Sequence, residues 1–501
     1  MYKPSRAATL LAGASLALTG LVATPAQAAD QSPAGQADAW LANQSFYNAG
    51  ARIDYLQQLT LLGRPSDAQV SAIKSGAVDY ATSAEAKAKL VYAGDLVSQD
   101  ANTWGAGDLV AGVAEGVDDT TGRIQGAYTT PASQALAVRA LAATNGRTVH
   151  PEFVGALAYL VGQQCSDGRF RDALADSPCG TDTTTPGSAD ATAFVLLYLE
   201  DAGVTGIDYE LARKWLSSTQ QTDGSWKSPD QAWGPGEANS NSTGLAALAL
   251  GKGTSAAKSA AAWLRKVQAR DAGTCRTKIA PADNGAIAFR PADYDAATAA
   301  GLDEGAYTRG QWVYATQQSL AALRDAPASA GKLTLSGPTG YVKAGTRQRL
   351  TVRNVAPISK ACLTGPGAVQ QGWEADASGT STRTISAPAG TANRTYRVVD
   401  SEGRVATRVL KVLGAKTFTI SKSAARVKRG RYVRITVRGM APRERVKVFY
   451  KGARIRNTSA TAKGTYTTRF RVGSSTGLKT IVVKGQFPDI RKGKATFRVV
   501  R

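Results

Sequence analysis

Apolar residues recur at two different spacings along the chain, and the change from one to the other falls near residue 330. Before it, Ala- and Leu-rich segments such as 134–141 and 243–250 repeat apolar positions at the helical period, between loops rich in Gly, Asp, Ser and Pro. After it, segments such as 432–437 and 446–450 alternate apolar and polar residues, as short strands do. The pattern predicts an all-α domain followed by all-β sandwiches.

The helical domain divides into six predicted hairpins, each made of a more polar outer helix and a more apolar inner helix. The outer helices are expected near 33–45, 66–80, 106–114, 151–164, 209–221 and 256–269. The inner helices are expected near 53–63, 85–98, 131–143, 188–202, 240–251 and 311–325. Six hairpins are enough to close a ring, so the sequence predicts an α/α toroid over residues 29–329.

Within this domain a pattern of Leu, Gln, Gly and an aromatic residue occurs twice, at the spacing L-x3-Q-x3-G-x-W. The copies are Leu160, Gln164, Gly168 and Phe170, and then Leu216, Gln220, Gly224 and Trp226. Self-similarity at a period of about 50 residues indicates repeated supersecondary units that bury their apolar faces only against one another.

The repeat resembles the QW motif of the prenyltransferase and squalene–hopene cyclase family, and partial copies stand at 39–44 and 263–268. The resemblance implies an α/α toroid in which the repeat residues are structural: the glutamine ties helices together and the aromatic ring packs beneath them. Because fold and function separate so readily, the motif says little about activity.

The signatures of that family's enzymes are absent from the sequence. Hopene-type cyclases use a D-x-D-D acid, and Asp118-Asp119 lacks the preceding Asp. The zinc-dependent branch needs Asp, Cys and His ligands, whereas this chain has one histidine, His150, in a predicted loop. We therefore expect a non-catalytic protein with no metal and no cofactor. The alternative is a toroid cyclase or glycan-active enzyme with Asp118, Asp119 or Asp190 as the acid.

Two other classes of toroid protein stay open. Glycan lyases use Tyr, His, Arg or Asn around an acidic sugar, and Tyr128, Tyr307, Arg309 and Asn241 offer similar groups. The secreted vitamin B12 carriers are similar in layout, with a helical barrel followed by β structure, although none of their motifs occurs here.

A toroid has a concavity where the loops before the inner helices converge, and free N–H groups point there. Helix capping is the simpler interpretation of several polar residues near these ends, including Asp190. The candidate ligand-binding residues are Asp54, Asp118, Asp119, Tyr128, Gln134, Asp190, Asn239, Asn241, Tyr307 and Gln311.

The two β domains, over 330–414 and 415–501, resemble bacterial immunoglobulin-like repeats. The last one has an opening segment at 427–430 and Gly-containing turns at 439–444 and 462–466, and the segment 342–345 holds the opening position of the first. Such modules act as spacers or adhesion units in their family.

Net charge is concentrated at one end of the chain. Residues 416–501 hold 24 Lys and Arg against 2 Asp and Glu, while residues 1–329 hold 25 against 32. The excess of positive charge on residues 416–501 creates an electrostatic field that attracts anionic polymers. We expect attachment to an anionic envelope polymer or acidic polysaccharide; the alternative is a surface adapted for solubility. No base-reading motif points to nucleic acid.

The N-terminus and the cysteines both indicate export. Lys3 and Arg6 precede an apolar stretch that ends in a small-residue site, so residues 1–28 are expected to be a signal peptide, and no transmembrane anchor is expected. A secreted or cell-wall protein permits disulfides, for which we expect the pairs Cys165–Cys179 and Cys275–Cys362 among three connectivities.

Overall fold

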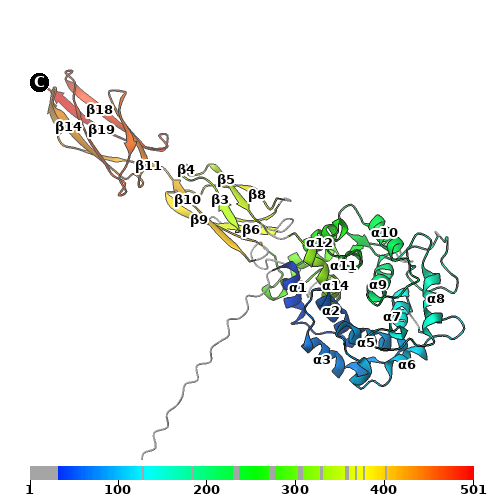
Figure 1. Cartoon of the computed structure of the whole chain (residues 1–501). Coiled ribbons are helices and arrows are strands. Elements are labelled where there is room, and N and C mark those ends of the chain that lie inside the picture. The colour runs from blue at the N-terminus through cyan, green and yellow to red at the C-terminus, as the bar shows by residue number, and fades with distance from the viewer. Residues whose placement is uncertain are drawn as a thin grey trace, which may run out of the picture.

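The computed structural model confirms the division into a helical half and a β half (Figure 1). It describes residues 32–126, 129–182, 184–229, 236–269, 277–302, 309–327, 331–355, 360–366, 369–375, 378–400 and 403–501. The predicted signal peptide lies outside these residues. The domain boundaries at 329/330 and 414/415 stay predictions.

Each helix that the sequence predicts coincides with a helix of the structure, usually a few residues shorter. The outer helices are α1 (Pro33–Leu41), α3 (Asp67–Ser75), α6 (Leu109–Ala114), α8 (Phe153–Gln163), α10 (Tyr209–Thr219) and α12 (Ser255–Val267). The inner helices are α2 (Ala49–Leu61), α5 (Ala84–Leu96), α7 (Pro131–Leu141), α9 (Ala189–Leu199), α11 (Ser240–Leu250) and α14 (Arg309–Ser319). The predicted helix 66–80 is divided into α3 and α4 (Ala77–Tyr80), and the predicted helix 311–325 continues from α14 into the 3-10 segment η4 (Leu320–Asp325). The sequence did not predict α13 (Pro291–Ala300) or the 3-10 segments η1 (Ala101–Trp104) and η2 (Pro281–Asp283).

The inner helices contact one another in a closed circuit. Each packs on the next in the order α2, α5, α7, α9, α11 and α14, and α14 packs back on α2 (Figure 1). Burial separates the two layers most clearly at one hairpin, where every residue of α11 is buried but only Ala212 and Leu216 of α10 are. The outer helices α1 and α12 bury more than half of their residues. Small residues in the inner helices permit this close approach, so the apolar faces of neighbouring units form one continuous core.

The Gln and Gly of the repeat tie each unit to the outer helix of the next. Gln220 Nε2 donates to the carbonyls of Gly224 and Ala256, both at 3.0 Å. Gly224 has φ +96°, and a Cβ there would stand 2.4 Å from the carbonyl oxygen of Ser259 in α12. Only glycine permits both this conformation and this approach. Trp226, 1% exposed, donates its indole N–H to the Leu216 carbonyl at 2.9 Å.

The earlier copy of the repeat makes the same tie. Gln164 Nε2 donates to the carbonyls of Gly168 (3.3 Å) and Asp208 (2.9 Å). At Gly168, with φ +95°, a Cβ would stand 2.4 Å from the backbone of Leu211 in α10. The repeat residues are therefore structural in both copies.

Two further glutamines make such ties without the sequence spacing. Gln134 Nε2 donates to the carbonyls of Gly122 (2.8 Å) and Ala156 (3.0 Å). Gln268 Nε2 donates to those of Pro33 (2.8 Å) and Gly285 (3.2 Å), which joins the end of α12 to α1 at the beginning of the helical half. The last tie links the sixth outer helix, α12, to the first, α1.

Cys165 and Cys179 form the predicted disulfide, with Cα atoms 4.7 Å apart. Cys362 is also disulfide-bonded, and Cys275, its predicted partner, lies outside the described residues.

The two β units have the same topology. In the first, a three-stranded sheet in the order β3-β5-β8 accompanies a five-stranded sheet in the order β4-β10-β9-β6-β7. In the second, a sheet in the order β12-β14-β17 accompanies β19-β18-β15-β16, with β11 and β13 also paired to β19. Each unit has its own apolar core between its sheets. Two sheets related in this way make an immunoglobulin-like sandwich.

The strands of these units are two to ten residues long. The first unit contains β3 (Thr334–Ser336), β4 (Tyr341–Lys343), β5 (Arg347–Arg353), β6 (Lys360–Gly365), β7 (Val369–Glu374), β8 (Ser381–Ser386), β9 (Ala392–Asp400) and β10 (Val405–Leu413). The second contains β11 (Lys416–Thr417), β12 (Thr419–Lys422), β13 (Arg426–Lys428), β14 (Tyr432–Arg438), β15 (Arg445–Tyr450), β16 (Ala453–Ser459), β17 (Tyr466–Arg471), β18 (Gly477–Lys484) and β19 (Arg491–Val500). A two-stranded ladder of β1 (Trp226–Lys227) and β2 (Ala238–Asn239) lies in the helical half.

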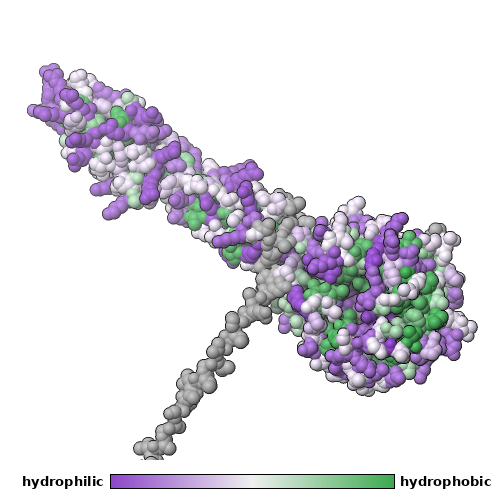
Figure 2. Space-filling model, viewed as in Figure 1, coloured by the Kyte–Doolittle hydropathy of each residue, from purple (hydrophilic) through white to green (hydrophobic). Residues whose placement is uncertain are grey.

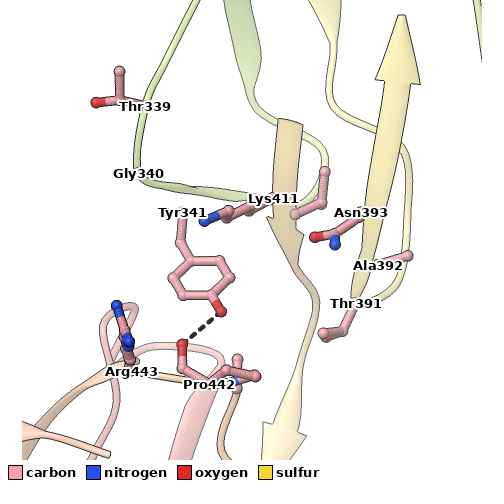
Figure 3. Close-up of a pocket in the computed structure, with 11 residues that line it drawn as sticks. Thr339, Gly340, Tyr341, Thr391, Ala392, Asn393, Lys411, Pro442 and Arg443 are labelled. Atoms are coloured by element: carbon pink, nitrogen blue, oxygen red, sulfur yellow. Dashed lines mark hydrogen bonds between the residues drawn. The ribbon is translucent and has the colours of Figure 1, made fainter. Parts of the chain in front are cut away.

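Polar contacts join the two β units end to end. The Tyr341 hydroxyl donates to the Pro442 carbonyl at 2.7 Å (Figure 3), and Gln486 Nε2 donates to the Tyr341 carbonyl at 3.2 Å. Lys343 of the first unit also pairs with Asp489 of the second. Each of these three contacts links a residue of the first β unit to a residue of the second.

Candidate functional site

Several of the predicted ligand-binding residues gather at the N-terminal ends of neighbouring inner helices. Asp190, Asn241 and Gln311 stand in the first turns of α9, α11 and α14, and α11 packs on both of the others. Among the residues that the structure describes, none donates a hydrogen bond to the buried atoms Asp190 Oδ1, Asn241 Oδ1 and Gln311 Oε1. Because Asn241 is only 6% exposed, its unpaired carbonyl is energetically costly as it stands.

A buried ion pair stands on the opposite inner helices. Lys89 Nζ of α5 lies 2.7 Å from Asp54 Oδ1 of α2, with side chains 17% and 12% exposed. Burial lowers the pKa of Lys89, but the adjacent Asp54 carboxylate together with the Tyr80 and Tyr314 phenols outweighs it, so the net pKa of Lys89 is raised.

Tyr314 of α14 links these two groups electrostatically. Desolvation by the surrounding helices raises the pKa of its phenol although the residue is 47% exposed, and the carboxylates of Asp54 and Asp190 raise that pKa further. The Tyr314 phenol therefore interacts electrostatically with two carboxylates, Asp54 and Asp190, and with the Lys89 ammonium group.

Asp190 is the carboxyl group whose pKa moves furthest upward among those with a resolved shift in the described residues. Burial raises its pKa to about 6, against an opposing hydrogen bond from Ser242. It therefore titrates within two units of neutrality, which suits proton exchange or binding of a donor-rich ligand.

The structure gives other predicted site residues local structural roles. Gln134 is fully buried in its tie to α8 and accepts from the Ile124 N–H, and Asn239 caps α11 by accepting from the Ser242 N–H at 2.9 Å. Asp118 accepts from the N–H groups of Thr120 and Thr121, and hydrogen bonds from Thr121 lower its pKa.

The remaining predicted residues do not join this group in the described chain. Asp119 is exposed in the same loop as Asp118. Arg309 pairs with Asp283 at 2.7 Å. Tyr128 and Tyr307 lie outside the described residues. In the part of the chain that the structure describes, no three His, Cys, Asp or Glu side chains cluster as metal ligands.

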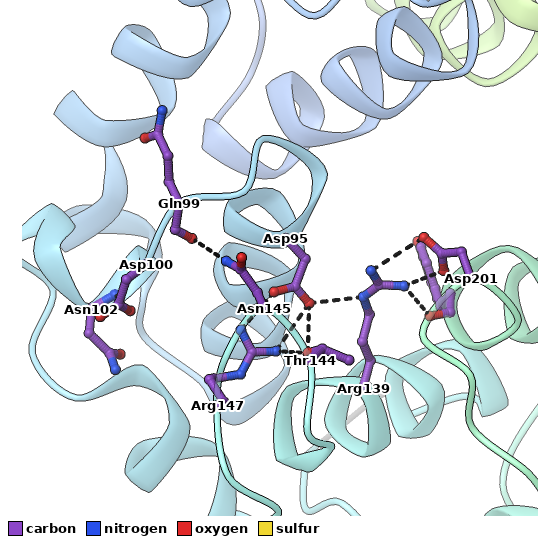
Figure 4. Close-up of polar contacts among 10 residues, drawn as sticks. Asp95, Gln99, Asp100, Asn102, Arg139, Thr144, Asn145, Arg147 and Asp201 are labelled. Carbon is purple, nitrogen blue, oxygen red and sulfur yellow. Dashed lines mark hydrogen bonds and ion pairs between the residues drawn. The ribbon is translucent and has the colours of Figure 1, made fainter.

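A buried charge network, which the sequence did not predict, lies at the C-terminal ends of inner helices (Figure 4). Asp95, 3% exposed at its side chain, pairs with Arg139 at 3.0 Å and with Arg147 at 2.6 Å. Arg139 also pairs with Asp201 and donates to the Tyr198 carbonyl at 2.7 Å. These contacts join α5, α7 and the end of α9, so the network is structural.

The last β unit has almost no acidic residues to neutralise its cations. Its two carboxylates are both engaged: Glu444 is buried against Arg491 at 2.7 Å, and Asp489 pairs with Lys343 of the first unit. Strand alternation then places the remaining cations outward, as in β14, where Val433, Ile435 and Val437 are buried. Figure 2 shows this unit to be predominantly hydrophilic on the visible face.

Four arginines and a tyrosine gather on the three-stranded sheet of this unit. We call this set the arginine face: Tyr432, Arg434, Arg438, Arg469 and Arg471. Arg434 stands directly opposite Arg469 across β14 and β17, and the Arg469 guanidinium lies 5.4 Å from the centre of the Tyr432 ring. Like charges in directly opposite positions destabilise a sheet, so a bound anion would stabilise this face.

No family model matches the chain, and no curated protein matches it. Among solved structures it is similar to the Yersinia pseudotuberculosis adhesin InvE, with 16% identity, a TM-score of 0.19, and 34% of this chain and 58% of that one covered. It is similar to the Escherichia coli adhesin FdeC, with 16% identity, a TM-score of 0.27, and coverages of 35% and 67%. It is also similar to the fibronectin(III)-like modules of Clostridium thermocellum CbhA, with 16% identity, a TM-score of 0.20, and 33% of this chain and 92% of that one covered.

These comparisons contradict the resemblance to the prenyltransferase and squalene–hopene cyclase family. No family model or curated protein supports it, and the solved structures named above are adhesins or fibronectin-like modules. The physical reason for the misleading signal is visible in the ties of Gln220 and Gln164. A helix end, a positive-φ glycine and a buried aromatic ring meet the packing needs of stacked helical hairpins, whatever their family.

None of the helices among the described residues is long and apolar enough to cross a membrane.

Proposed function

We propose that the protein is exported and adheres to anionic polymers of a cell envelope through its last β unit. The observation that carries the proposal is the uncompensated charge: 24 cations stand against two carboxylates, both already engaged. The leader-like residues 1–28 and the Cys165–Cys179 disulfide support an oxidising destination outside the cytoplasm.

The arginine face is the proposed contact surface. Its guanidinium groups project from paired strands, and such groups bind carboxylates and phosphates through two parallel hydrogen bonds. Each Lys or Arg held near an anionic surface contributes about 1 kcal/mol. Two such contacts therefore correspond to about a 30-fold change in affinity.

Retention of the full chain on purified cell walls tests this proposal. We expect Arg434→Gln/Arg469→Gln to weaken retention about 30-fold, and added salt to weaken the wild type similarly. The matched control is Arg347→Gln/Arg349→Gln on β5, which removes the same charge from the corresponding strand, where neutral Ser386 and Thr384 stand opposite. Equal retention of the arginine-face variant and the control would reject the arginine face as the contact surface, and a wild-type chain that is not retained would reject the adhesion.

We also propose that the helical half is an α/α toroid whose interior holds a ligand rich in hydrogen-bond donors. The closed circuit of inner helices supports the toroid. The donor-free oxygens of Asp190, Asn241 and Gln311 support the ligand class, because hydroxyl or ammonium groups would satisfy all three. Native mass spectrometry of the exported protein should find a stoichiometric added mass. A wild-type chain without added mass would reject this part of the proposal. An added mass that the Asn241→Leu variant retains in full would reject it as well.

A further inference from the structure

A polar cleft of about 530 Å³ lies between the two β units. Its walls come from β4, β9 and β10 of the first unit and from the turn before β15 of the second (Figure 3). We call this space the interdomain cleft, and its lining includes Tyr341, Thr391, Asn393, Lys411, Pro442 and Arg443. Its volume falls within the range of small-ligand sites.

The two walls of the cleft are fixed relative to one another. Besides the bond from the Tyr341 hydroxyl to the Pro442 carbonyl, Arg491 donates to the Gly414 carbonyl at 2.9 Å in the connecting segment. Arg491 is itself held by two 2.7 Å hydrogen bonds to Glu444, and these side chains are 2% and 0% exposed. A buried and fully bonded arginine at the junction keeps the cleft formed before any ligand arrives, which lowers the entropic cost of binding.

The charge in the cleft is positive and unpaired. Lys411 extends toward the backbone end of Tyr341, while Arg443 lies near the hydroxyl end of the same side chain (Figure 3). Both cations are exposed, and neither forms an ion pair within the described chain. No Asp or Glu lines the cleft. An anionic group placed between them would meet two cations from two different domains.

The rest of the lining fits a carbohydrate. The Thr391 oxygen accepts from the Gly414 N–H at 2.9 Å and keeps its hydroxyl proton to donate, while Asn393 offers an amide that matches sugar hydroxyls. The half-buried Tyr341 ring offers an apolar face with its hydroxyl already bonded. A site with a few convergent polar groups around one aromatic face is suited to a ring that carries both hydroxyls and a charge.

We infer that the interdomain cleft binds an acidic sugar unit of an anionic polymer, with the carboxylate or phosphate between Lys411 and Arg443 and the sugar against Tyr341. The inference rests on the proposed adhesion to anionic polymers and gives it a defined, stoichiometric site. The site also explains why a rigid junction would matter: Lys411 belongs to the first β unit and Arg443 to the second, so the junction must hold the two cations in place.

Calorimetric titration of the full chain with short oligomers tests the cleft separately from wall retention. The probes are a galacturonate tetramer, a glycerol phosphate tetramer and a neutral maltotetraose. We expect one site per chain for an acidic tetramer and at least tenfold weaker binding of the neutral one. Binding of the uronate alone identifies an acidic polysaccharide, and binding of the phosphate alone identifies a phosphodiester polymer.

The variants are chosen to preserve the fold. Lys411→Gln keeps a strand residue, and Arg443→Asn suits the left-handed backbone at φ +56°. Together they should weaken tetramer binding at least tenfold, while the control Arg347→Gln/Arg349→Gln on β5, which does not line the cleft, leaves it within twofold. Tyr341→Phe and Tyr341→Leu both lose the interdomain hydrogen bond, but only Leu loses the ring, so the Phe variant should bind about fivefold more tightly.

Either of two results would overturn the proposal that the cleft binds an acidic sugar. In the first, no acidic tetramer binds the wild type; in the second, the Lys411→Gln/Arg443→Asn variant binds the tetramer as tightly as the wild type does. Undiminished retention on walls in either case leaves the adhesion proposal standing. Loss of wall retention with intact tetramer binding would reject the adhesion proposal and keep the cleft.

Discussion

Removing Arg139 gives the most direct test of how the inner helices are held together. Its guanidinium is bonded to Asp95 at 3.0 Å with side chains 6% and 3% exposed, and it also bonds the carbonyl that ends α9. Breaking a buried pair by deleting one partner costs about 3–5 kcal/mol, because the other charge stays buried. Arg147 still pairs with Asp95, so Arg139→Ala should lose about 3 kcal/mol of unfolding free energy.

The assay is denaturant unfolding of the full chain, followed by circular dichroism at the helical wavelength, because the β units contribute little helix signal. The control is Arg213→Ala, whose pair with Glu200 is 35% and 46% exposed and should cost below about 1 kcal/mol. If the two variants lose the same free energy, the network does not hold the helices as argued. A double-mutant cycle with Asp95→Ala should give a coupling on the order of 2 kcal/mol.

Three further outcomes are expected. The Asp190 carboxyl binds its proton more tightly in the folded state, because burial raises its pKa to about 6. Its contribution is therefore full below pH 4 and lost as pH rises through 6, so the wild type should lose about 3 kcal/mol relative to Asp190→Asn over that window, and parallel pH profiles would refute this. Replacing both Cys165 and Cys179 by Ser opens a loop of sequence separation 14 and should cost about 3 kcal/mol, read as a lower melting temperature; an unchanged one would show that the crosslink is energetically idle. Gly224→Ala should cost at least about 2 kcal/mol because its Cβ meets the α12 backbone, whereas Gly253→Ala, at φ +82° with open space around it, should cost about 1 kcal/mol; equal losses would refute the clash.

The sequence by itself determined the local elements and the charge distribution. Helical spacing before residue 330 and alternation after it were sufficient because each period fixes which face of an element is apolar. The glycines of the repeat were likewise visible, since Gly168 and Gly224 stand at a constant distance from their glutamines, whereas their positive φ was shown only by the structure. The charge of the last unit follows from composition alone.

The tertiary structure decided which distant groups meet. The tie of Gln268 to Gly285 spans an insertion that breaks the motif spacing, and Gln134 makes the same tie from the start of an inner helix. Periodicity shows that a side chain faces inward but does not identify its partner, because that depends on how separate elements pack. For this reason Gln134 was predicted to bind a ligand although it ties helices together.

The same limit applies to charge. Asp95, Arg139 and Arg147 look like ordinary polar residues at the ends of helices, and only the closed circuit brings them together in a buried network. The interdomain cleft is a still clearer case, because Lys411 and Arg443 belong to different domains and meet only through the junction that Arg491 holds. Composition determines how many cations a domain has, whereas the fold decides which of them face a shared cavity.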